Sequence, residues 1–500
     1  MESILQEELL LLQQPSPQLD KLALSSLFAP ASRLLTLQES TRLTYQRAKA
    51  FCNAYGVTCN LFVGTLAPFA MKRPDLQPVL QAALEFNVSA QFMLTEVNHG
   101  LDARNIQTTA TTLPDGDIDL HTPTPKDAKV MPPTTPKGGL PVVAIVMARL
   151  IDGGKDCGIR PLLVQINDGT DMCKGVIAKA LPQRTGCHPV DHSITSFNHV
   201  RLLKSCLLSS PVAAQNHRDD RDEFMSTIYR VAVGTLFITA GVIPGLKLVT
   251  FNAARFSQRR LVTGQDRKPM AVIEFRTQCL PILHAIAQYS VLEPFFVSAA
   301  MAFRDTSMDP RVRHGIATVF KAVVLGHFEK SVRALGEMCG WQGHFEHNQI
   351  LQLELEIRGV STAEGDIRVL AIRTYPKVVI CARLTLNKGL ASELLIGRYK
   401  LPPPKDSNSP IARHEASLLS EGREILQKSA KGAHRSNEFN RDILPLALPL
   451  VVAIGHRMAF EAARCCKDII ENMVFQQDLR SFLIYSRYHY IQYINRRRPK

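Results

Sequence analysis

Residues 94–112 read LTEVNHGLDARNIQTTATT, and this stretch marks the point where the hydrophobic pattern of the chain changes. Before it, apolar residues recur at helical spacing, as in residues 77–90, QPVLQAALEFNVSA. From Gln91 onward, short runs rich in Val, Ile and Thr alternate with turn clusters, a pattern typical of short strands. The sequence therefore predicts an N-terminal α-helical domain over residues 1–90 and a middle antiparallel β-domain over residues 91–215.

Long helical patterns return in the second half of the chain. Four of them, with short connections, cover residues 225–256, 268–302, 310–339 and 364–386, which is typical of a helical bundle. We therefore predict a four-helix bundle over residues 219–395. Residues 401–410, LPPPKDSNSP, have the composition of a linker, and residues 411–500 are predicted to form a short C-terminal helical extension. The predicted fold class is α+β and multidomain.

The composition is that of a globular protein. Of the 500 residues, 45% are apolar and 21% are charged, which excludes a disordered, collagen-like or disulfide-stapled chain. The net charge of +14 favours partners that carry phosphate, either coenzymes or nucleic acid. The sequence contains no basic stripe interleaved with aromatic residues, so we expect no nucleic-acid partner.

Several absences in the sequence indicate an intracellular protein. The eleven cysteines include no CxxC pair, and the N-terminus lacks the basic region of a signal peptide. The most apolar stretch, residues 443–454, is short and contains Pro445 and Pro449, so we expect no transmembrane segment. The segment CHPVDH (187–192) has zinc-ligand side chains but lies among predicted strands, and we predict no metal site.

Four further segments carry functional side chains in a defined order after residues 94–112. ARFSQRR (254–260) ends a predicted helix in arginines, and IEFRTQC (273–279) begins the next helix. EMCGWQGH (337–344) is a glycine-containing turn, and STAEGD (361–366) places a carboxylate beside a glycine. Each motif alone is a weak signal, whereas five in order are specific.

Together the five segments resemble the acyl-CoA oxidase and acyl-CoA dehydrogenase superfamily, with the oxidase branch closest. In that family a Thr-Glu pair opens the β-domain, and Thr95 and Glu96 match this pair here. The resemblance covers roughly residues 20–390. It implies an acyl-CoA dehydrogenase-like fold, with an N-terminal helical domain, a β-domain, a four-helix bundle and a short helical extension.

The resemblance implies FAD-dependent α,β-desaturation of an acyl-CoA or another acyl thioester. This reaction needs a carboxylate that removes the α-proton and a flavin that accepts the β-hydride, and Glu364 matches the family's base. The residues that match the family's FAD contacts are Thr95, Gly100, Gly138, Gly139, Arg259, Gln278, Gly340, Gly343 and Asp366. The residues expected at the substrate pocket are Glu96, Met131, Ala363 and Gly365.

The resemblance also implies partners and a location. Molecular oxygen would reoxidise the flavin of an oxidase, and an electron-transfer partner would do so in a dehydrogenase. A homodimer is expected, with FAD contacts that cross the subunit interface. The family suggests the peroxisome, although the tail RRRPK lacks the usual SKL-type signal, and a cytoplasmic location is the other expectation.

Four departures from the family pattern leave two alternatives open. KVMPPTTPKGG (129–139) replaces the Trp-Pro-Gly-Gly loop, and Leu101, Trp341 and Ala363 replace a usual Ser, Gly and aromatic residue. One alternative is a biosynthetic flavoenzyme of the same fold that acts on a polyketide-like thioester. The other is a flavin-free binding or scaffold protein, against which Glu364 argues because a scaffold has no use for a base.

Overall fold

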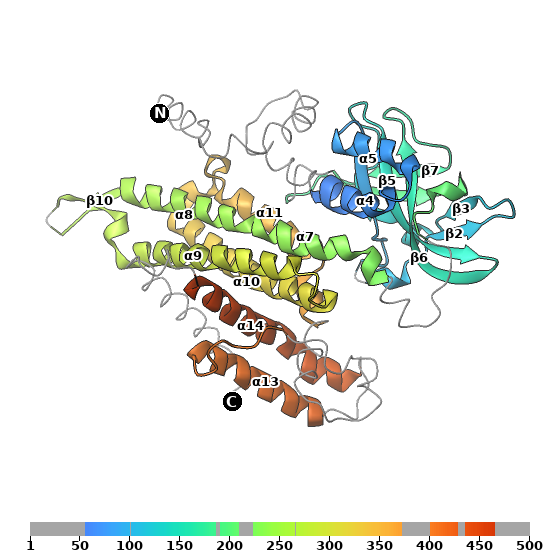
Figure 1. Ribbon diagram of the computed structural model, residues 1–500. Helices are drawn as coiled ribbons and strands as arrows, with labels where there is room; N and C mark the ends of the chain where they lie inside the picture. Colours follow the sequence, from blue (N-terminus) through green and yellow to red (C-terminus); the bar gives the residue numbers. More distant parts are fainter. Residues whose placement is uncertain are drawn as a thin grey trace. The chain divides into compact units, whose positions relative to one another are not determined.

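The computed structural model describes residues 56–100, 102–186, 191–209, 224–265, 267–372, 401–428 and 436–465 (Figure 1). Its contacts divide the chain into two compact units. Unit 1 comprises Met1–Arg184 and His188–Arg230, and unit 2 comprises Thr185–Cys187 and Val231–Lys500. The predicted division into four domains is not tested by this partition and stays a prediction.

Unit 1 begins, within the described residues, with short helices. These are η1 (Gly56–Val63), α4 (Gly64–Ala70), η2 (Pro74–Leu76) and α5 (Gln77–Leu84). The helix predicted over 77–90 thus ends six residues early, because the chain turns at Phe86, whose φ is +53°, and enters a strand at Ser89. The predicted helices over residues 1–55 lie outside the described residues.

The predicted β-domain is present, but its main sheet is mixed rather than antiparallel. The strands are β1 (Ser89–Met93), β2 (Thr109–Thr112), β3 (Ile118–His121), β4 (Lys129–Met131), β5 (Val142–Asp152), β6 (Lys155–Asn167), β7 (Val176–Ala180), β8 (Ser193–Phe197) and β9 (Val200–Leu202). The main sheet has the order β1-β5-β2-β3-β9, and β6 also pairs with β5. The central strand β5 runs parallel to β1 and β2, since long connections separate them, while its hairpin with β6 is antiparallel.

Unit 2 is helical, and Figure 1 shows its long helices side by side. Its elements are α7 (Tyr229–Ala240), α8 (Val242–Arg259), the hairpin of β10 (Leu261–Thr263) and β11 (Pro269–Ala271), α9 (Arg276–Arg304), α10 (Pro310–Met338) and α11 (Ile350–Thr362). The helix predicted over residues 225–256 is broken at Gly241, between α7 and α8. Helix α11 was not predicted. The helix that was predicted over residues 364–386 begins at Ile367, and its residues 373–386 lie outside the described residues.

The C-terminal extension packs on the bundle. After the predicted linker, α13 (Pro410–Lys428) and α14 (Leu444–Arg464) are described, and α14 packs against α9 and α10. Side chains such as Leu246, Phe295 and Ile454 are fully or almost fully buried in this core. The extension therefore belongs to the same compact unit as the bundle.

The length of these helices bears on the expectation that no segment spans a membrane. By length and composition alone, Tyr229–Arg259, Arg276–Arg304 and Phe439–Arg464 could each cross a membrane. The stretch 443–454 is too short by itself, but it is part of a longer helix that tolerates Pro445 in its first turn and Pro449 inside. In the structure, 44%, 44% and 67% of the respective apolar windows are buried, so much of their apolar surface lies inside the protein.

Candidate active site

Glu364 lies in a sharp turn between α11 and the next helix. Its φ is +56°, a left-handed conformation that costs a non-glycine residue roughly 1–2 kcal/mol, and the φ of Gly365 is +101°. Asp366 follows, and its carboxylate accepts hydrogen bonds from the backbone N–H groups of Arg368 and Val369 at 2.9 and 3.1 Å. Asp366, which was predicted to contact FAD, therefore serves as the N-cap of the following helix.

Helix α7 forms one wall of the turn. The half-buried Glu364 carboxylate packs against Gly234, at the place where a side chain on that glycine would begin. The hydroxyl of the neighbouring Thr235 has two carbonyl acceptors in range, Glu364 at 2.6 Å and Val231 at 2.9 Å, and the shorter contact is the one to Glu364. Because Thr235 is fully buried, this contact is shielded from water.

Helix α10 supplies a buried cation beneath the same turn. The Lys321 ammonium donates to the carbonyls of Ala363 at 2.6 Å and Gly365 at 2.8 Å, and its side chain is fully buried. Burial lowers the pKa of Lys321 to about 8, while the charges of Glu364 and Asp366 oppose this shift. The carbonyls of the predicted residues Ala363, Glu364 and Gly365 are thus held by side chains that could not be identified from the sequence motifs.

A second cluster gathers residues predicted to contact FAD. The Gln278 amide donates to the Ser257 hydroxyl at 2.9 Å and to the Met338 carbonyl at 3.2 Å. These bonds bring the first turn of α9 beside the last turn of α8, which carries the exposed Arg259, and beside the start of the predicted glycine turn.

The two glycines of the predicted glycine turn differ in their surroundings: Gly340 has open space beside it, whereas Gly343 is closely packed. Gly340 has a φ of +56°, and an added side chain there would meet no atom within 4 Å. Gly343 packs against the Gly336 carbonyl, so a side chain at position 343 would collide with backbone. Trp341, between them, is 71% exposed and packs edge-on against Phe345, with ring centroids 4.9 Å apart. The turn therefore presents backbone and an aromatic ring to its surroundings.

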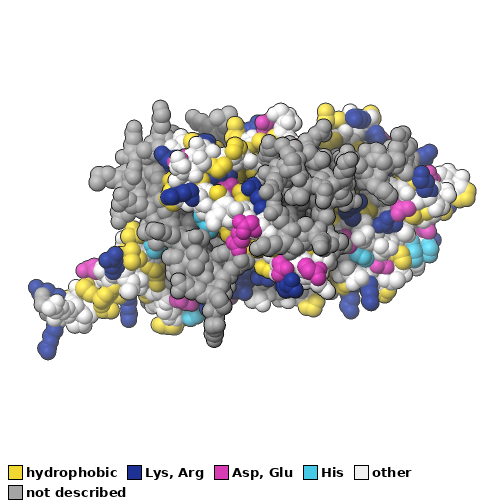
Figure 2. All heavy atoms as spheres, turned by 90° about the horizontal axis from the view of Figure 1, so that it is seen from below, with side chains coloured by type: hydrophobic (Ala, Val, Ile, Leu, Met, Phe, Trp, Pro, Cys, Tyr) yellow, Lys and Arg dark blue, Asp and Glu magenta, His cyan; other side chains and the backbone are white. Residues whose placement is uncertain are grey.

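Basic side chains mark the same end of the bundle. The β10–β11 hairpin follows α8 and carries the exposed Arg260, Arg267 and Lys268. Figure 2 shows basic side chains on the projecting end of the molecule where Figure 1 places β10. With Arg259 these guanidinium and ammonium groups suit an anionic ligand such as a pyrophosphate.

The two clusters of unit 2 lie far apart. Lys321, beneath Glu364, and Met338, beside Gln278, are seventeen positions apart on the continuous helix α10. At a rise of 1.5 Å per residue this separates them by about 25 Å. Any ligand held by residues of both clusters must be long or must be shared between two copies of the chain.

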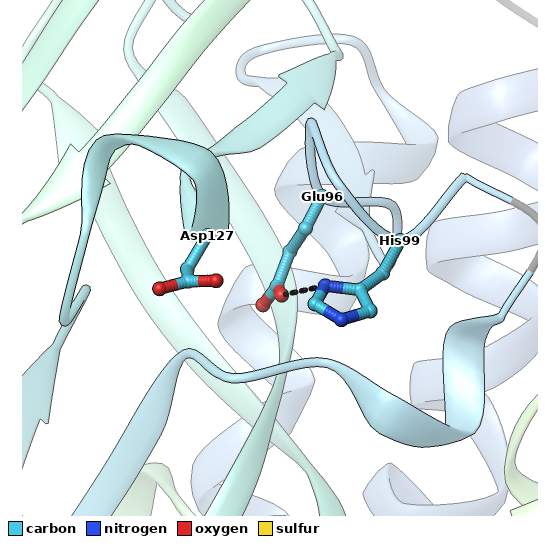
Figure 3. Close-up of side chains that lie close together, drawn as sticks. All are labelled: Glu96, His99 and Asp127. Atoms are coloured by element: carbon cyan, nitrogen blue, oxygen red, sulfur yellow. Dashed lines mark ion pairs between the residues drawn. The ribbon is translucent and has the colours of Figure 1, made fainter.

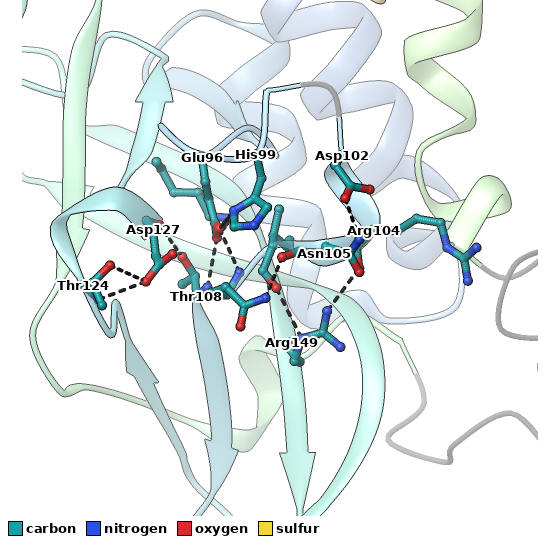
Figure 4. Close-up of polar contacts among 12 residues, drawn as sticks. Glu96, His99, Asp102, Arg104, Asn105, Thr108, Thr124, Asp127 and Arg149 are labelled. Carbon is teal, nitrogen blue, oxygen red and sulfur yellow. Dashed lines mark hydrogen bonds and ion pairs between the residues drawn. The ribbon is translucent and has the colours of Figure 1, made fainter. Parts of the chain in front are cut away.

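In unit 1, Glu96 is a buried carboxylate that forms several hydrogen bonds with its neighbours (Figure 4). Its side chain has no solvent exposure, and it accepts hydrogen bonds from the backbone N–H groups of Gln107 and Thr108 at 2.8 and 2.9 Å. The Lys129 ammonium lies 3.0 Å away and is also fully buried. Burial raises the pKa of Glu96, but Lys129 and the two N–H groups outweigh it, so the pKa lies below its ordinary value. Its position gives no support to the predicted role at the substrate pocket.

Glu96, His99 and Asp127 form the one group within the described residues whose side chains could together hold a metal ion (Figure 3). His99 Nδ1 lies 3.2 Å from Glu96 Oε2. However, Lys129 already supplies a positive charge to Glu96, and Asp127 accepts from the Thr124 hydroxyl and N–H at 2.7 and 3.1 Å. The group therefore fits a hydrogen-bonded support better than a metal centre. Most of the segment 187–192 lies outside the described residues.

The rebuilt loop after β4 has unusual backbone angles. Met131 has a φ of +89° and is 43% exposed, while Gly138 and Gly139 have φ of +72° and +73°. The carbonyl of the predicted FAD residue Thr95 accepts from the N–H of Val130 at 3.0 Å, which ties the first motif to the start of this loop. Gly100 has open space around its α-carbon, and Leu101 lies outside the described residues.

The residues that sequence reasoning missed are Gly234, Thr235 and Lys321. One signal could have found the lysine, because it interrupts an otherwise apolar run, IATVFKAVVLG (316–326). A charge within such a run indicates a buried group with specific partners. No comparable signal exists for Gly234, which looks like an ordinary helical glycine.

Comparison with known proteins supports the motif analysis, although no protein-family model matches the chain. Peroxisomal acyl-coenzyme A oxidase 3 of Homo sapiens is 25% identical over 320 residues, which are 59% of this chain and 45% of that protein. The chain thus spans less than half the length of this curated relative.

Solved structures of acyl-CoA oxidases share the fold. Acyl-CoA oxidase 1 from Yarrowia lipolytica matches with a TM-score of 0.75 at 15% identity, covering 99% of this chain and 81% of that chain. Acyl-CoA oxidase-2 of Caenorhabditis elegans, bound with FAD, ascaroside-CoA and ATP, has a TM-score of 0.72 at 18% identity and covers 88% and 70%. These findings confirm the predicted α+β fold class and the resemblance to the oxidase branch: the chain has the fold of the acyl-CoA oxidases.

Proposed function

We propose that this protein is an FAD-dependent oxidoreductase that desaturates an acyl-CoA, or another acyl thioester, between its α and β carbons. The observation that carries the proposal is the position of Glu364. It occupies the segment that matches the family's base, at a left-handed φ, with its carboxylate half-buried against α7. Such a strained and supported glutamate is typical of a functional site.

In the proposed reaction, Glu364 removes the α-proton of the thioester. Its half-buried position keeps bulk water from competing for the proton. The backbone N–H of Glu364 is proposed to donate to the thioester carbonyl, which makes the α-proton more acidic. Ala363 leaves space beside the thioester that an aromatic residue fills in the family, so the acyl group is proposed to be bulkier than a straight chain.

The residues of the second cluster fit an FAD. FAD, when bound, supplies the acceptor for the β-hydride. Arg259 is proposed to bind the pyrophosphate, Gln278 and the turn at Gly340 and Gly343 to bind the nucleotide end, and Thr95, Gly138 and Gly139 to border the flavin. Because the glycine turn and Glu364 are about 25 Å apart along α10, we propose a homodimer in which each FAD contacts both copies. Molecular oxygen is the proposed electron acceptor, and the peroxisome the proposed location, as the names of the relatives suggest.

The first test is the absorbance spectrum of the purified protein, with the cofactor released and identified. Bound FAD supports the proposal, and peroxide release is then measured on straight-chain, branched and aromatic acyl-CoA thioesters. Glu364→Gln should bind FAD normally and lose at least about 10³-fold in rate. A colourless protein that refuses added FAD would favour the scaffold alternative, and a fully active Glu364→Gln variant would overturn the assignment of the base.

A further inference from the structure

Lys321 is a buried lysine whose ammonium group donates to backbone carbonyls on either side of Glu364. An ammonium group removed from water costs several kcal/mol unless its hydrogen bonds are replaced. Lys321 is fully buried on α10, in a stretch of the helix where the apolar Phe320 and Val323 are also buried. The two acceptors it contacts are the carbonyls on either side of Glu364, at 2.6 and 2.8 Å.

Thr235 completes the support from the opposite helix. Its hydroxyl donates to the carbonyl of Glu364 itself at 2.6 Å. Side chains from α7 and α10 thus hold three consecutive carbonyls, those of Ala363, Glu364 and Gly365. A turn with two successive positive φ angles has no repeating hydrogen-bond pattern of its own, so these three bonds hold the backbone from which the Glu364 side chain projects.

We propose that Lys321 and Thr235 are positioning residues that hold Glu364 in the orientation needed for removal of the α-proton. This inference rests on the proposed function, in which Glu364 is the base. Neither side chain touches the substrate; each acts through the backbone of the turn. Loss of either should misplace the carboxylate by a fraction of an ångström to an ångström, which costs up to about 10²-fold in rate.

The matched pair Thr235→Val and Thr235→Ser provides the sharpest test. Val keeps the shape of the side chain and removes the donor, whereas Ser keeps the donor. We expect Thr235→Val to lower kcat about 10-fold or more with KM within twofold, and Thr235→Ser to recover most of the loss. Lys321→Met should lower kcat similarly, and Lys247→Met, a surface lysine of α8, serves as its control.

A readout of the proton transfer separates positioning from a merely structural role. The deuterium isotope effect on kcat is measured with the α-deuterated form of the acyl-CoA that is turned over fastest in the panel, beside the melting temperature and the FAD content. Positioning predicts that Thr235→Val raises the isotope effect, because removal of the α-proton becomes slower, while FAD content stays normal. An unchanged isotope effect with activity that falls only in proportion to folded protein would overturn the inference.

The outcomes also distinguish this inference from the proposed function. If Glu364→Gln is inactive while Lys321→Met and Thr235→Val retain full activity, the positioning role is wrong and the base assignment stands. If Glu364→Gln is active, the base assignment fails, and the inference fails with it. Should Lys321→Met not fold, the Thr235 pair still decides the outcome.

Discussion

Replacing Gly234 by alanine should separate the activity of the protein from its stability. Gly234 lies inside α7, where alanine is favoured over glycine by about 1 kcal/mol. The new Cβ would overlap the Glu364 carboxylate, at a separation far shorter than real Cβ atoms show. The carboxylate is the flexible end of a side chain, so it can move away at little cost to folding.

The required movement sets the expected loss of activity. An alanine Cβ would lie 2.2 Å from the carboxylate carbon, so to reach ordinary van der Waals contact, at 3.4–4 Å, the carboxylate must retreat by about 1.2–1.8 Å. A displacement of this size at a catalytic group costs about 10²-fold in rate, or about 2.7 kcal/mol of transition-state stabilisation. Gly234→Ala should therefore lower kcat/KM about 100-fold while the melting temperature stays equal or rises.

The assay is peroxide release from the best acyl-CoA of the panel, with thermal melting and FAD content measured on the same preparation. The control is Gly326→Ala on α10, where an added Cβ meets no atom within 4 Å. It should melt slightly higher than the wild type and retain full activity. A Gly234→Ala protein with normal FAD content and kcat/KM within twofold of the wild type would refute the link between this contact and catalysis.

Two further predictions concern stability. Lys129→Met leaves the Glu96 carboxylate buried without its cation and should destabilise unit 1 by about 3–5 kcal/mol. This is measured as a shift of the urea midpoint, against exposed Lys126→Met as control; an equal effect of both variants would contradict the role of the pair. The second prediction is acid lability caused by His327 and His456, whose Nε2 atoms are 3.1 Å apart in the bundle core. Burial lowers the pKa of His456 to about 3, and burial with the neighbouring His456 holds that of His327 well below its ordinary value. Unfolding therefore takes up protons below about pH 6.5, and stability should fall as pH drops from 7 toward 4, by up to about 1.4 kcal/mol per pH unit for each histidine. His456→Gln should show a shallower pH dependence of the melting temperature than the exposed His347→Gln, and equal slopes would contradict the assignment.

Much of the fold could be predicted because its signals are local. The run PVVAIVMARL (141–150) became β5, and the long helical patterns became α8, α9 and α10. The partners of β5 could not be predicted in this way. Its parallel pairing with β1 joins residues separated by a long connection, and nothing in the local turn chemistry encodes that pairing.

The same difference between local and long-range signals decides which residues of the candidate site could be predicted. Glu364 could be predicted because it lies within a motif beside Gly365 and Asp366. Gly234 could not be predicted, because a glycine in a helix is by itself only a weak helix former. Its role is to leave room for the carboxylate of Glu364, which lies 130 positions later in the chain. The helix predicted from Glu364 begins three residues later for the same reason, since tertiary hydrogen bonds hold residues 363–365 in a turn.

Two groups of residues bear on the choice between an enzyme and a scaffold protein: those that depart from the family pattern, and those that surround Glu364. The departures from the family pattern, at Met131, Trp341 and Ala363, fall on parts that we propose to border the flavin or the substrate, where a change of substrate would require them. The surroundings of Glu364 instead carry a buried ammonium and a strained φ, both of which reduce stability. A protein that only binds would gain stability by replacing Lys321 with an apolar side chain and Glu364 with glycine. Their presence together is accounted for by a base that must point in one direction, which favours an enzyme with an altered acyl pocket.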